Sequence, residues 1–341
     1  MDTPRSRLLS APDKFRGTAT AAEVAAAAGR GARGAGWEAE DVPVADGGEG
    51  TLEALGGRTR WARVRGPLGA PVEAEWRMSD DGAVIEMARA SGLVLAGGPE
   101  GNDPVQATTY GTGELISTAF DEKARRVIVG VGGSATTDGG LGAVTALGAR
   151  RLRGVDVTVA CDVDITFVEA AAAFGPQKGA TPAQVALLER RLERLAQVYE
   201  RDYGVDVRRL PGSGAAGGLA GGLAALGARL VPGFDVVADA LSLAERVADA
   251  DLVFTGEGFL DGQSFAGKAV GGVVTLCREA GVPVLVVAGQ VYWDEVPDGA
   301  VDGVQVVSLV ERFGEDRSMA DVLGCVEEVV GEVVLSRGGA R

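Results

Sequence analysis

The sequence predicts an α/β protein of two domains, in which a Rossmann-like parallel α/β/α domain is interrupted by a second, inserted α/β domain. The length of 341 residues fits two compact domains. Short apolar runs bounded by glycine or charge recur along the chain, and most are followed by helical patterns, as is typical of a parallel sheet covered by helices. Between about 61 and 90 this alternation gives way to three runs separated by a Pro-Gly and an Asp-Gly turn, which indicates a meander of strands.

The meander sets the expected domain limits. We place the first domain at 1–60 plus 246–341 and the inserted domain at 61–245, while 105–150 could belong to either. The runs expected to form the strands of the α/β alternation lie at 8–12, 40–46, 127–133, 251–258, 282–289 and 303–310.

Two helices are predicted by capping boxes, in which a Thr and a residue three positions later satisfy each other's backbone donors. Thr20 with Glu23 opens the first, and Thr181 with Gln184 opens the second, which also has Pro182 in its first turn. We expect the apolar stripe of the second helix to pack in the core. That stripe consists of Val185, Leu188, Leu192 and Leu195.

Composition limits the function. The net charge of −15, without blocks of like charge, argues against nucleic acid and anionic membranes as partners and favours small molecules. Cys161, Cys277 and Cys325 are widely spaced, and no run approaches the roughly 18 apolar residues of a membrane span, so we expect a cytoplasmic protein. Because the chain has no histidine, acid–base chemistry must use Asp, Glu or Lys, and any metal must have oxygen ligands. Phosphoryl transfer with Mg²⁺ is the leading example of such chemistry.

Four segments place a carboxylate or lysine between a strand end and a helix start, where open α/β sheets bind ligands. In the first, Asp13, Lys14 and Arg16 could hold a carboxylate or phosphate, or could form a solvated turn of local ion pairs. In the second, Asp46 and Glu49 flank two glycines and could ligate Mg²⁺, accept a hydroxyl proton, or simply make a turn.

The third segment leaves a strand through Gly132, Gly133 and Ser134 and leads to a helix through Asp138. The dinucleotide G-x-G-x-x-G/A spacing holds only loosely from Gly130, so a glycine and hydroxyl cradle for phosphate is the more economical interpretation, with a plain tight turn as the alternative.

The fourth segment, "TGEGFLDGQSFAGKAVGG", has the G-x-x-x-x-G-K spacing of a P-loop, but Gly262 comes eight residues after the strand and Ala269 replaces the hydroxyl residue. We read it instead as an oxygen-donor pair, Glu257 and Asp261, followed by a phosphate-reaching ammonium, Lys268.

Two further residues are candidates. Asp162 follows Cys161 at the end of a strand, where its carboxylate could face a cleft while the thiol is buried. Lys178 precedes the helix capped by Thr181, a position suited to binding an anion.

Ten segments occur in this order through nearly the whole chain: "APDKFRG", "ADGGEGT", "IEMARASGL", "ATTYGTGELI", "GVGGSATTDGG", "ALGAR", "FGPQKGAT", "GAAGGLAGGL", "GEGFLDGQ" and "GK". In these segments the sequence resembles the bacterial glycerate kinases that phosphorylate D-glycerate with ATP. The resemblance implies a two-domain α/β enzyme with its active site in the cleft between domains. It also implies MgATP as phosphoryl donor and 2-phosphoglycerate as the product.

Three positions depart from the family pattern: Ile165 in "CDVDITF", Thr137 and Phe259, where relatives frequently have asparagine, asparagine and arginine. The departure in "CDVDITF" leaves open a kinase of another small hydroxy acid or polyol. A kinase that forms 3-phosphoglycerate and a nucleotide-binding regulator without catalysis are further alternatives. The oligomeric state is also open, a homodimer included.

From the residues and the resemblance together we expect four sets of site residues. The expected catalytic residues are Asp46, Asp261, Lys268 and Lys178; the substrate-binding ones Asp13, Lys14, Arg16, Ser134 and Asp138; the cofactor-binding ones Gly132, Gly133, Gly256 and Gly258; and the metal ligands Glu49, Asp162 and Glu257.

Overall fold

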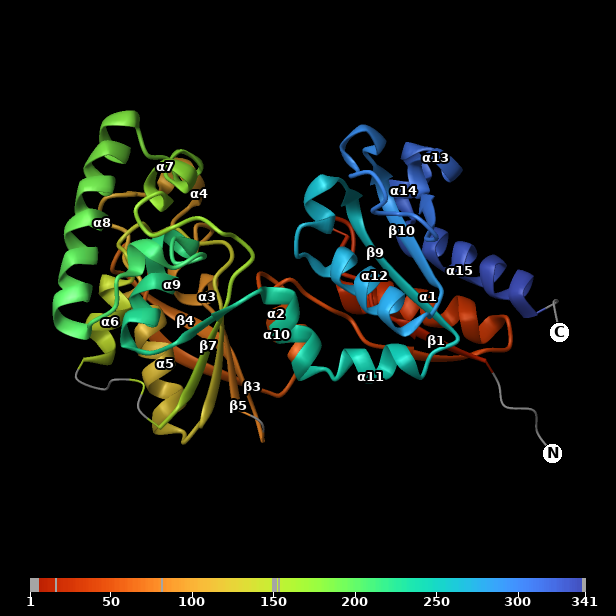
Figure 1. Ribbon diagram of the computed structural model, residues 1–341, viewed down its shortest axis with the longest axis horizontal. Coiled ribbons are helices and arrows are strands. Elements are labelled where there is room, and N and C mark those ends of the chain that lie inside the picture. Colours follow the sequence, from red (N-terminus) through yellow and green to blue (C-terminus); the bar gives the residue numbers. More distant parts are fainter. Residues whose placement is uncertain (1–5, 16, 81, 149–151, 153, 339–341) are drawn as a thin grey trace. The chain divides into compact units, whose positions relative to one another are not determined.

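The computed structural model describes residues 6–15, 17–80, 82–148, 152 and 154–338. The chain forms two compact units, one of Met1–Asp46 with Val237–Arg341 and the other of Gly47–Val236 (Figure 1). Each contains one sheet with helices, so the predicted α/β class is confirmed. Both limits lie earlier in the chain than expected, and 105–150 belongs to the second unit.

The first limit shifts because the segment after Asp46 packs on the second unit's sheet. Leu52 and Val236 form one apolar cluster with Val84, Ile128 and Ala160 of that sheet. Burial of this shared face therefore assigns residues 47–60 to the second unit rather than to the first.

The first unit contains a five-stranded sheet in the order β11-β10-β9-β1-β2, in which every neighbouring pair is parallel. The predicted run 40–46 overlaps β2 only at its start, because β2 ends at Asp41, although the N–H groups of Val42 and Val44 still donate to the carbonyls of Ser10 and Pro12. The strands are β1 (Arg7–Ser10), β2 (Glu38–Asp41), β9 (Leu252–Leu260), β10 (Val284–Val291) and β11 (Gln305–Ser308).

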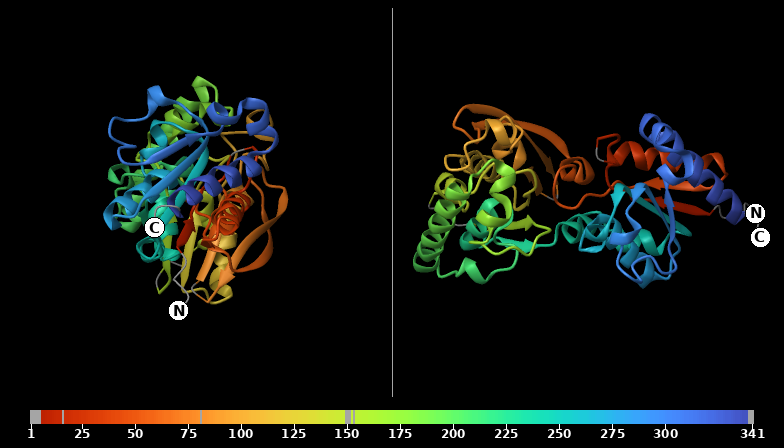
Figure 2. Two further views of the ribbon diagram at one scale, coloured as in Figure 1. Left: turned by 90° about the vertical axis from the view of Figure 1, so that its right-hand side faces the viewer. Right: turned by 90° about the horizontal axis from the view of Figure 1, so that it is seen from above.

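Helices cover both faces of this sheet. Alternate strand residues such as Leu8 and Phe254 pack with α1 and α15, and α12 contacts β9 and β10. Figure 2 shows α15 (blue) lying across α1 (red), and the approach is close, since a Cβ at Gly31 would lie 2.4 Å from the Glu327 carbonyl oxygen. The helices are α1 (Ala21–Gly34), α11 (Leu243–Ala248), η3 (Gly262–Phe265), α12 (Ala269–Ala280), η4 (Trp293–Glu295), α13 (Leu309–Phe313), α14 (Glu315–Ala320) and α15 (Val322–Gly338). The helix α10 (Gly233–Ala240) begins in the second unit and ends in the first.

The second unit contains a six-stranded sheet in the order β3-β4-β5-β6-β7-β8. The predicted meander is confirmed, because β3, β4 and β5 are antiparallel, whereas β5 through β8 are parallel. The strands are β3 (Arg58–Arg65), β4 (Pro71–Ser79), β5 (Gly82–Glu86), β6 (Arg126–Gly130), β7 (Asp156–Ala160) and β8 (Arg229–Val231).

Most helices of the second unit share one apolar core with one face of its sheet, while α2 and α10 lie on the other. The helices are α2 (Thr51–Leu55), α3 (Ala88–Ser91), α4 (Gly98–Gly101), α5 (Tyr110–Asp121), α6 (Leu141–Leu147), α7 (Ala170–Phe174), η1 (Pro176–Lys178), α8 (Pro182–Tyr203), η2 (Val207–Arg209) and α9 (Ala215–Leu226).

Both predicted capping boxes are confirmed: Thr20 caps α1 with Glu23, and Thr181 caps α8 with Gln184. The predicted stripe of α8 packs as expected, with Leu188 and Leu192 buried and Val185 and Leu195 partly buried against the core.

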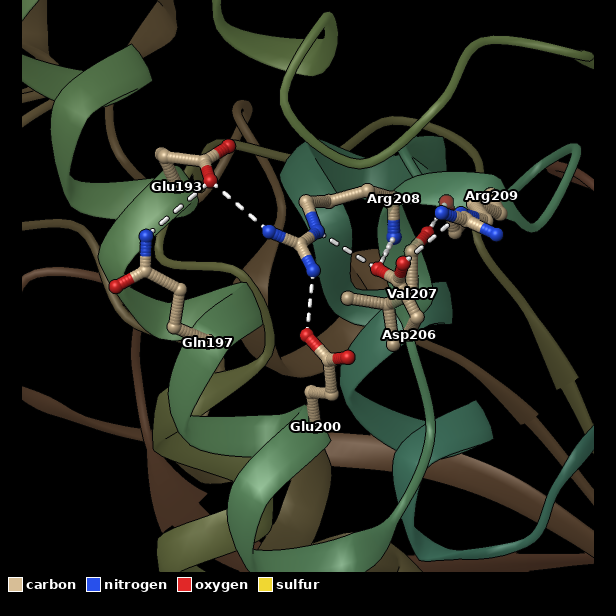
Figure 3. Close-up of polar contacts among 8 residues, drawn as sticks. Glu193, Gln197, Glu200, Asp206, Val207, Arg208 and Arg209 are labelled. Atoms are coloured by element: carbon tan, nitrogen blue, oxygen red, sulfur yellow. Dashed lines mark hydrogen bonds and ion pairs between the residues drawn. The ribbon is translucent and has the colours of Figure 1, made fainter.

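An arginine ties the end of α8 to η2 (Figure 3). The Arg208 guanidinium donates through Nη1 to Glu193 Oε1 at 3.1 Å and through Nε to Asp206 Oδ1 at 2.7 Å, and it also pairs with Glu200. No helix among the described residues is long and apolar enough to cross a membrane.

Candidate active site

A polar pocket of about 330 Å³ lies in the first unit, at and beyond the carboxyl ends of its strands. We call it the carboxylate–lysine pocket, because four carboxylates and two ammonium groups line it. Its lining residues are Asp13, Lys14, Asp46, Glu257, Gly258, Phe259, Asp261, Gln263, Lys268 and Tyr292. Two of the four predicted strand-end segments, and Asp46 of a third, therefore meet in one place.

Glu257 is the most perturbed carboxyl of this pocket. Burial raises its pKa to about 7, and the negative charges of Asp13 and Asp261 also raise it, whereas a hydrogen bond from Ser264 and the charge of Lys268 lower it. Its Oε1 is buried and has no hydrogen-bond partner among the described residues. A buried acceptor without a donor costs free energy, so a cation or a proton at this oxygen would be stabilising.

Asp261 and Lys268 are placed by the turn that follows β9. Asp261 Oδ1 accepts hydrogen bonds from the backbone N–H groups of Gln263 at 2.8 Å and Ser264 at 3.2 Å, so this carboxylate also caps η3. Lys268 is the N-cap residue of α12, and its Nζ lies 3.4 Å from Gln263 Oε1. The P-loop interpretation is not supported, because the residues from Gly262 form a short 3-10 turn rather than a phosphate loop closing on the strand.

The first predicted segment is fixed to β9 by its backbone. The Asp13 N–H donates to the Gly256 carbonyl at 2.9 Å, and the Lys14 N–H donates to Asp13 Oδ1 at 2.7 Å. The side chains of Asp13 and Lys14 consequently reach the pocket from the end of β1. Arg16, predicted to bind substrate, lies outside the described residues.

Two aromatic rings form the rim of the pocket. Phe259 and Tyr292 are stacked with centroids 6.2 Å apart, and 47% and 40% of these residues are exposed. Large apolar groups are seldom left this open without a reason, so the rim offers a surface that a bound ligand can cover.

In the second unit, the glycine segments of two predicted sites pack backbone to backbone. A Cβ at Gly132 would lie 2.9 Å from Gly48 Cα, and one at Gly130 would lie 2.5 Å from the Gly47 carbonyl oxygen. Glycine is therefore required at 130 and 132 for this close approach, whatever else the loop binds. Gly132 and Gly133 are exposed, and Ser134 forms an isolated bridge with Gly92.

Lys178 is placed differently from the prediction. It is only 4% exposed, its Nζ donates to the Thr136 carbonyl at 2.7 Å, and it lines neither pocket described in this article. Burial lowers its pKa to about 7, partly opposed by the charge of Asp138. Its ammonium group is buried and binds the 134–138 loop through the Thr136 carbonyl, so it is not an exposed cation able to reach a phosphate.

The predicted metal ligands are divided between the two units. Glu257 belongs to the first unit, whereas Glu49 and Asp162 belong to the second, and Asp162 Oδ1 accepts the Gly233 N–H at 2.7 Å, beside the start of α10. Within the described ranges no three Asp, Glu or Cys side chains are close enough to hold a metal ion. Gly256, predicted to bind cofactor, is buried in β9, and a Cβ there would lie 2.1 Å from the Val287 carbonyl oxygen.

Three residues were missed by the sequence-based interpretation, and the strand-end rule could have found two of them. Glu86 ends β5, is 3% exposed, and accepts from the backbone N–H groups of Gly50 and Leu52, which positions the "ADGGEGT" segment. Tyr292 directly follows β10. Gln263 also lines the pocket, but it does not directly follow a strand, so the strand-end rule would not have found it.

A parallel α/β unit that gathers carboxylates and lysines at its strand ends defines a class of enzymes that bind small charged ligands there. The model of the glycerate kinase family matches residues 8–154 and 149–334. The chain is 42% identical to the glycerate 2-kinase of Escherichia coli K12, covering 84% of this chain and 86% of the relative, and 41% identical to a glycerate kinase of Halalkalibacterium halodurans, covering 90% and 91%.

A solved structure agrees with these sequence relatives. The crystal structure of a provisionally named glycerate kinase 2 from Salmonella typhimurium LT2 matches with a TM-score of 0.85 and 36% identity, over 98% of this chain and 99% of that one. The chain belongs to the glycerate kinase family. It is therefore an enzyme of the transferase class, a kinase that uses a nucleotide.

Proposed function

We propose that this enzyme transfers the γ-phosphoryl group of ATP to D-glycerate, with Mg²⁺, and forms 2-phosphoglycerate. Its relatives named glycerate kinase and glycerate 2-kinase support the substrate and the product. The observation that carries the proposal is the carboxylate–lysine pocket, which combines oxygen donors for a hard cation with two ammonium groups for phosphate charge.

The pocket fits Mg²⁺ by its donor chemistry. Mg²⁺ prefers oxygen ligands and is usually held by one or two carboxylates, with water and substrate phosphates completing the shell. The orphaned Oε1 of Glu257 and the neighbouring carboxylate of Asp261 are the residues we assign to it. When bound, the ion neutralises charge on the phosphate oxygens.

The chain's own groups then have separate tasks. Lys14 and Lys268 stabilise the negative charge that spreads over the transferred group, which is where preorganised cations contribute most. Asp46 accepts the proton of the attacking hydroxyl. The exposed Gly132–Ser134 segment remains our candidate for a phosphate or carboxylate contact in the second unit.

Phosphorus NMR of the product is the test of the reaction. The enzyme is incubated with ATP, Mg²⁺ and D-glycerate, and the resonance of 2-phosphoglycerate is expected. A 3-phosphoglycerate resonance would replace the proposed regiochemistry, and turnover only with another hydroxy acid would replace the substrate. ATP binding without product from any such acid would identify a nucleotide-binding regulator instead.

Variants of the pocket test the residue assignments. Asp46→Asn and Lys268→Ala are each expected to lower kcat/KM by roughly 10²-fold or more, the usual effect of removing a proton acceptor or a charge-stabilising group. Glu279→Gln, on the exposed surface of α12, is the matched control and is expected to retain wild-type turnover. Near-normal turnover of both pocket variants, in folded protein, would refute the assignment.

The cytoplasmic location also remains a proposal. Cys161, Cys277 and Cys325 are free and buried, which suits a reducing compartment. Fractionation of the native host cell with assay of glycerate kinase activity tests it, and activity in an exported fraction would contradict it.

A further inference from the structure

A second pocket lies in the other unit, and none of its lining residues has a task in the proposed reaction. It has a volume of about 680 Å³ and is lined by residues of the starts of α5 and α6, one side of α8 and the 105–108 loop. Figure 1 shows where these helices lie in the unit. We call it the arginine pocket. Its lining residues are Arg65, Val105, Gln106, Ala107, Thr108, Tyr110, Thr137, Asp138, Leu141, Gly142, Thr145, Arg191, Leu192, Arg194, Leu195 and Val198.

The arginine pocket is cationic within an acidic protein. Three arginines line it against one carboxylate, that of Asp138, although the whole chain carries a net charge of −15. The carboxylate is already engaged, since it accepts from the backbone N–H groups of Thr109, Gly140 and Gly142 and from the Thr109 hydroxyl. Its hydrogen bonds are therefore made at the starts of α5 and α6. The three arginines have no other carboxylate in the pocket, which suits the binding of an anion.

The arginines are available to a ligand. Arg191 donates through Nη1 to the Val105 carbonyl at 2.9 Å, which leaves its other guanidinium N–H groups. The Arg194 guanidinium makes no hydrogen bond or ion pair with the described part of the chain. Arginines that line a pocket in this way are suited to bidentate contact with phosphate oxygens.

The interior wall is apolar and aromatic. Leu141 is 49% exposed, and Leu195 and Val198 line the same pocket. The Arg65 guanidinium lies over the Tyr110 ring, with Cζ 4.1 Å from the centroid. Aromatic and guanidinium planes of this kind are suited to stacking with a flat heterocycle.

An unpartnered hydroxyl provides an independent sign of a ligand. Thr137 lines the pocket and is 1% exposed, and its Oγ1 is buried with no hydrogen-bond partner among the described residues. A buried hydroxyl without a partner is unfavourable in a resting fold, and a polar ligand atom would satisfy it.

From this combination we propose that the arginine pocket binds a nucleotide, with the base against the apolar wall and the phosphates toward the arginines. A pocket of this volume is in the range of small-molecule sites. A simple phosphate or carboxylate would leave the apolar wall exposed, and an uncharged ring would leave the arginines without a partner. The proposal does not depend on glycerate being the phosphoryl acceptor.

Binding measurements on the purified full-length protein test the site. Isothermal titration calorimetry with ATP, with adenosine and with tripolyphosphate compares the whole ligand with its two halves. ATP is expected to bind at least about tenfold more tightly than either half, because it engages both the wall and the arginines. Tripolyphosphate binding as tightly as ATP would overturn the nucleotide assignment.

Two variants and one control locate the site. Arg194→Ala and Thr137→Val are each expected to weaken ATP binding about tenfold, and Thr137→Val is expected to keep or raise Tm without ligand, because it removes an unsatisfied hydroxyl. Arg190→Ala, an exposed arginine of the same helix that does not line the pocket, is expected to stay within about twofold of wild type. Unchanged ATP affinity in both pocket variants would overturn the inference.

The outcome is separable from that of the proposed reaction. If phosphorus NMR shows no phosphoglycerate but Arg194→Ala still loses ATP affinity, the glycerate reaction fails and the nucleotide site stands. If phosphoglycerate forms and both pocket variants bind ATP as wild type does, the nucleotide site fails alone.

Discussion

Glu257→Gln should change how the stability of this protein depends on pH. In the folded protein the pKa of Glu257 is raised to about 7 from an ordinary value of 4.5, chiefly by burial. Between these values the folded state binds more protons than the unfolded state, so the extra stability is complete below about pH 4.5 and is lost as pH rises through about 7. This displacement corresponds to on the order of 3 kcal/mol of unfolding free energy.

The glutamine variant has no proton to lose, so it is expected to lack this part of the pH dependence. Relative to wild type it should become more stable as pH rises, by up to on the order of 3 kcal/mol above pH 8, because the wild type then carries a buried charge. Urea unfolding of both proteins between about pH 5.5 and 8.5 measures the difference, and this range stays above the pI of about 4.6.

Subtracting the unfolding free energy of the wild type from that of the variant at each pH cancels the contribution of all titratable groups that the two proteins share. Glu279→Gln removes an exposed carboxylate from the same unit and is the matched control, expected to keep the wild-type pH dependence. If the difference between wild type and Glu257→Gln is the same at every pH, Glu257 is not held in its neutral form, and the argument from burial and from its orphaned oxygen is refuted.

Three other predictions follow from the same structure. Lys178→Met should remove a rise in stability, on the order of a few kcal/mol, that the wild type shows as pH increases from about 7 to 10.5, because burial lowers the pKa of this lysine; identical slopes in urea unfolding would contradict it. Gly132→Ala should lower stability by about 1–3 kcal/mol, since its Cβ would meet Gly48, and a Tm equal to wild type would show that the loops can separate freely. Thr181→Ala should cost about 1 kcal/mol by removing the cap of α8, measured by urea unfolding against Thr275→Ala, a helix-interior threonine whose hydroxyl bonds only its own helix.

Much of the fold was predictable because its signals are local. The capping boxes at Thr20 and Thr181 depend on contacts between residues three apart, and both occur as predicted. The strands and the meander follow from apolar periodicity and turn residues, which are also properties of short windows. The unit limits could not be read in the same way, because Leu52 and Val236 join the second sheet through side-chain burial over long separations in sequence.

The candidate site was predictable to the extent that parallel strands align their carboxyl ends. The residues selected by this rule that line one pocket are Asp13, Lys14, Glu257, Asp261 and Lys268. The rule does not say which way a side chain turns once it leaves the strand. Lys178 and Asp138 have the residue types of a binding site, yet the first holds a backbone carbonyl and the second holds backbone N–H groups.

The sequence by itself determined the α/β class, the positions of most strands and helices, the absence of histidine chemistry and the glycerate kinase family. These follow from periodicity, composition and ordered motifs. Only the tertiary structure decided which carboxylates share a pocket, that Glu257 is desolvated and Lys178 buried, and that Thr137 has an unsatisfied hydroxyl beside three arginines. The physical reason is that burial, and with it pKa and hydrogen-bond satisfaction, depends on packing between segments far apart in the chain, which no local pattern specifies.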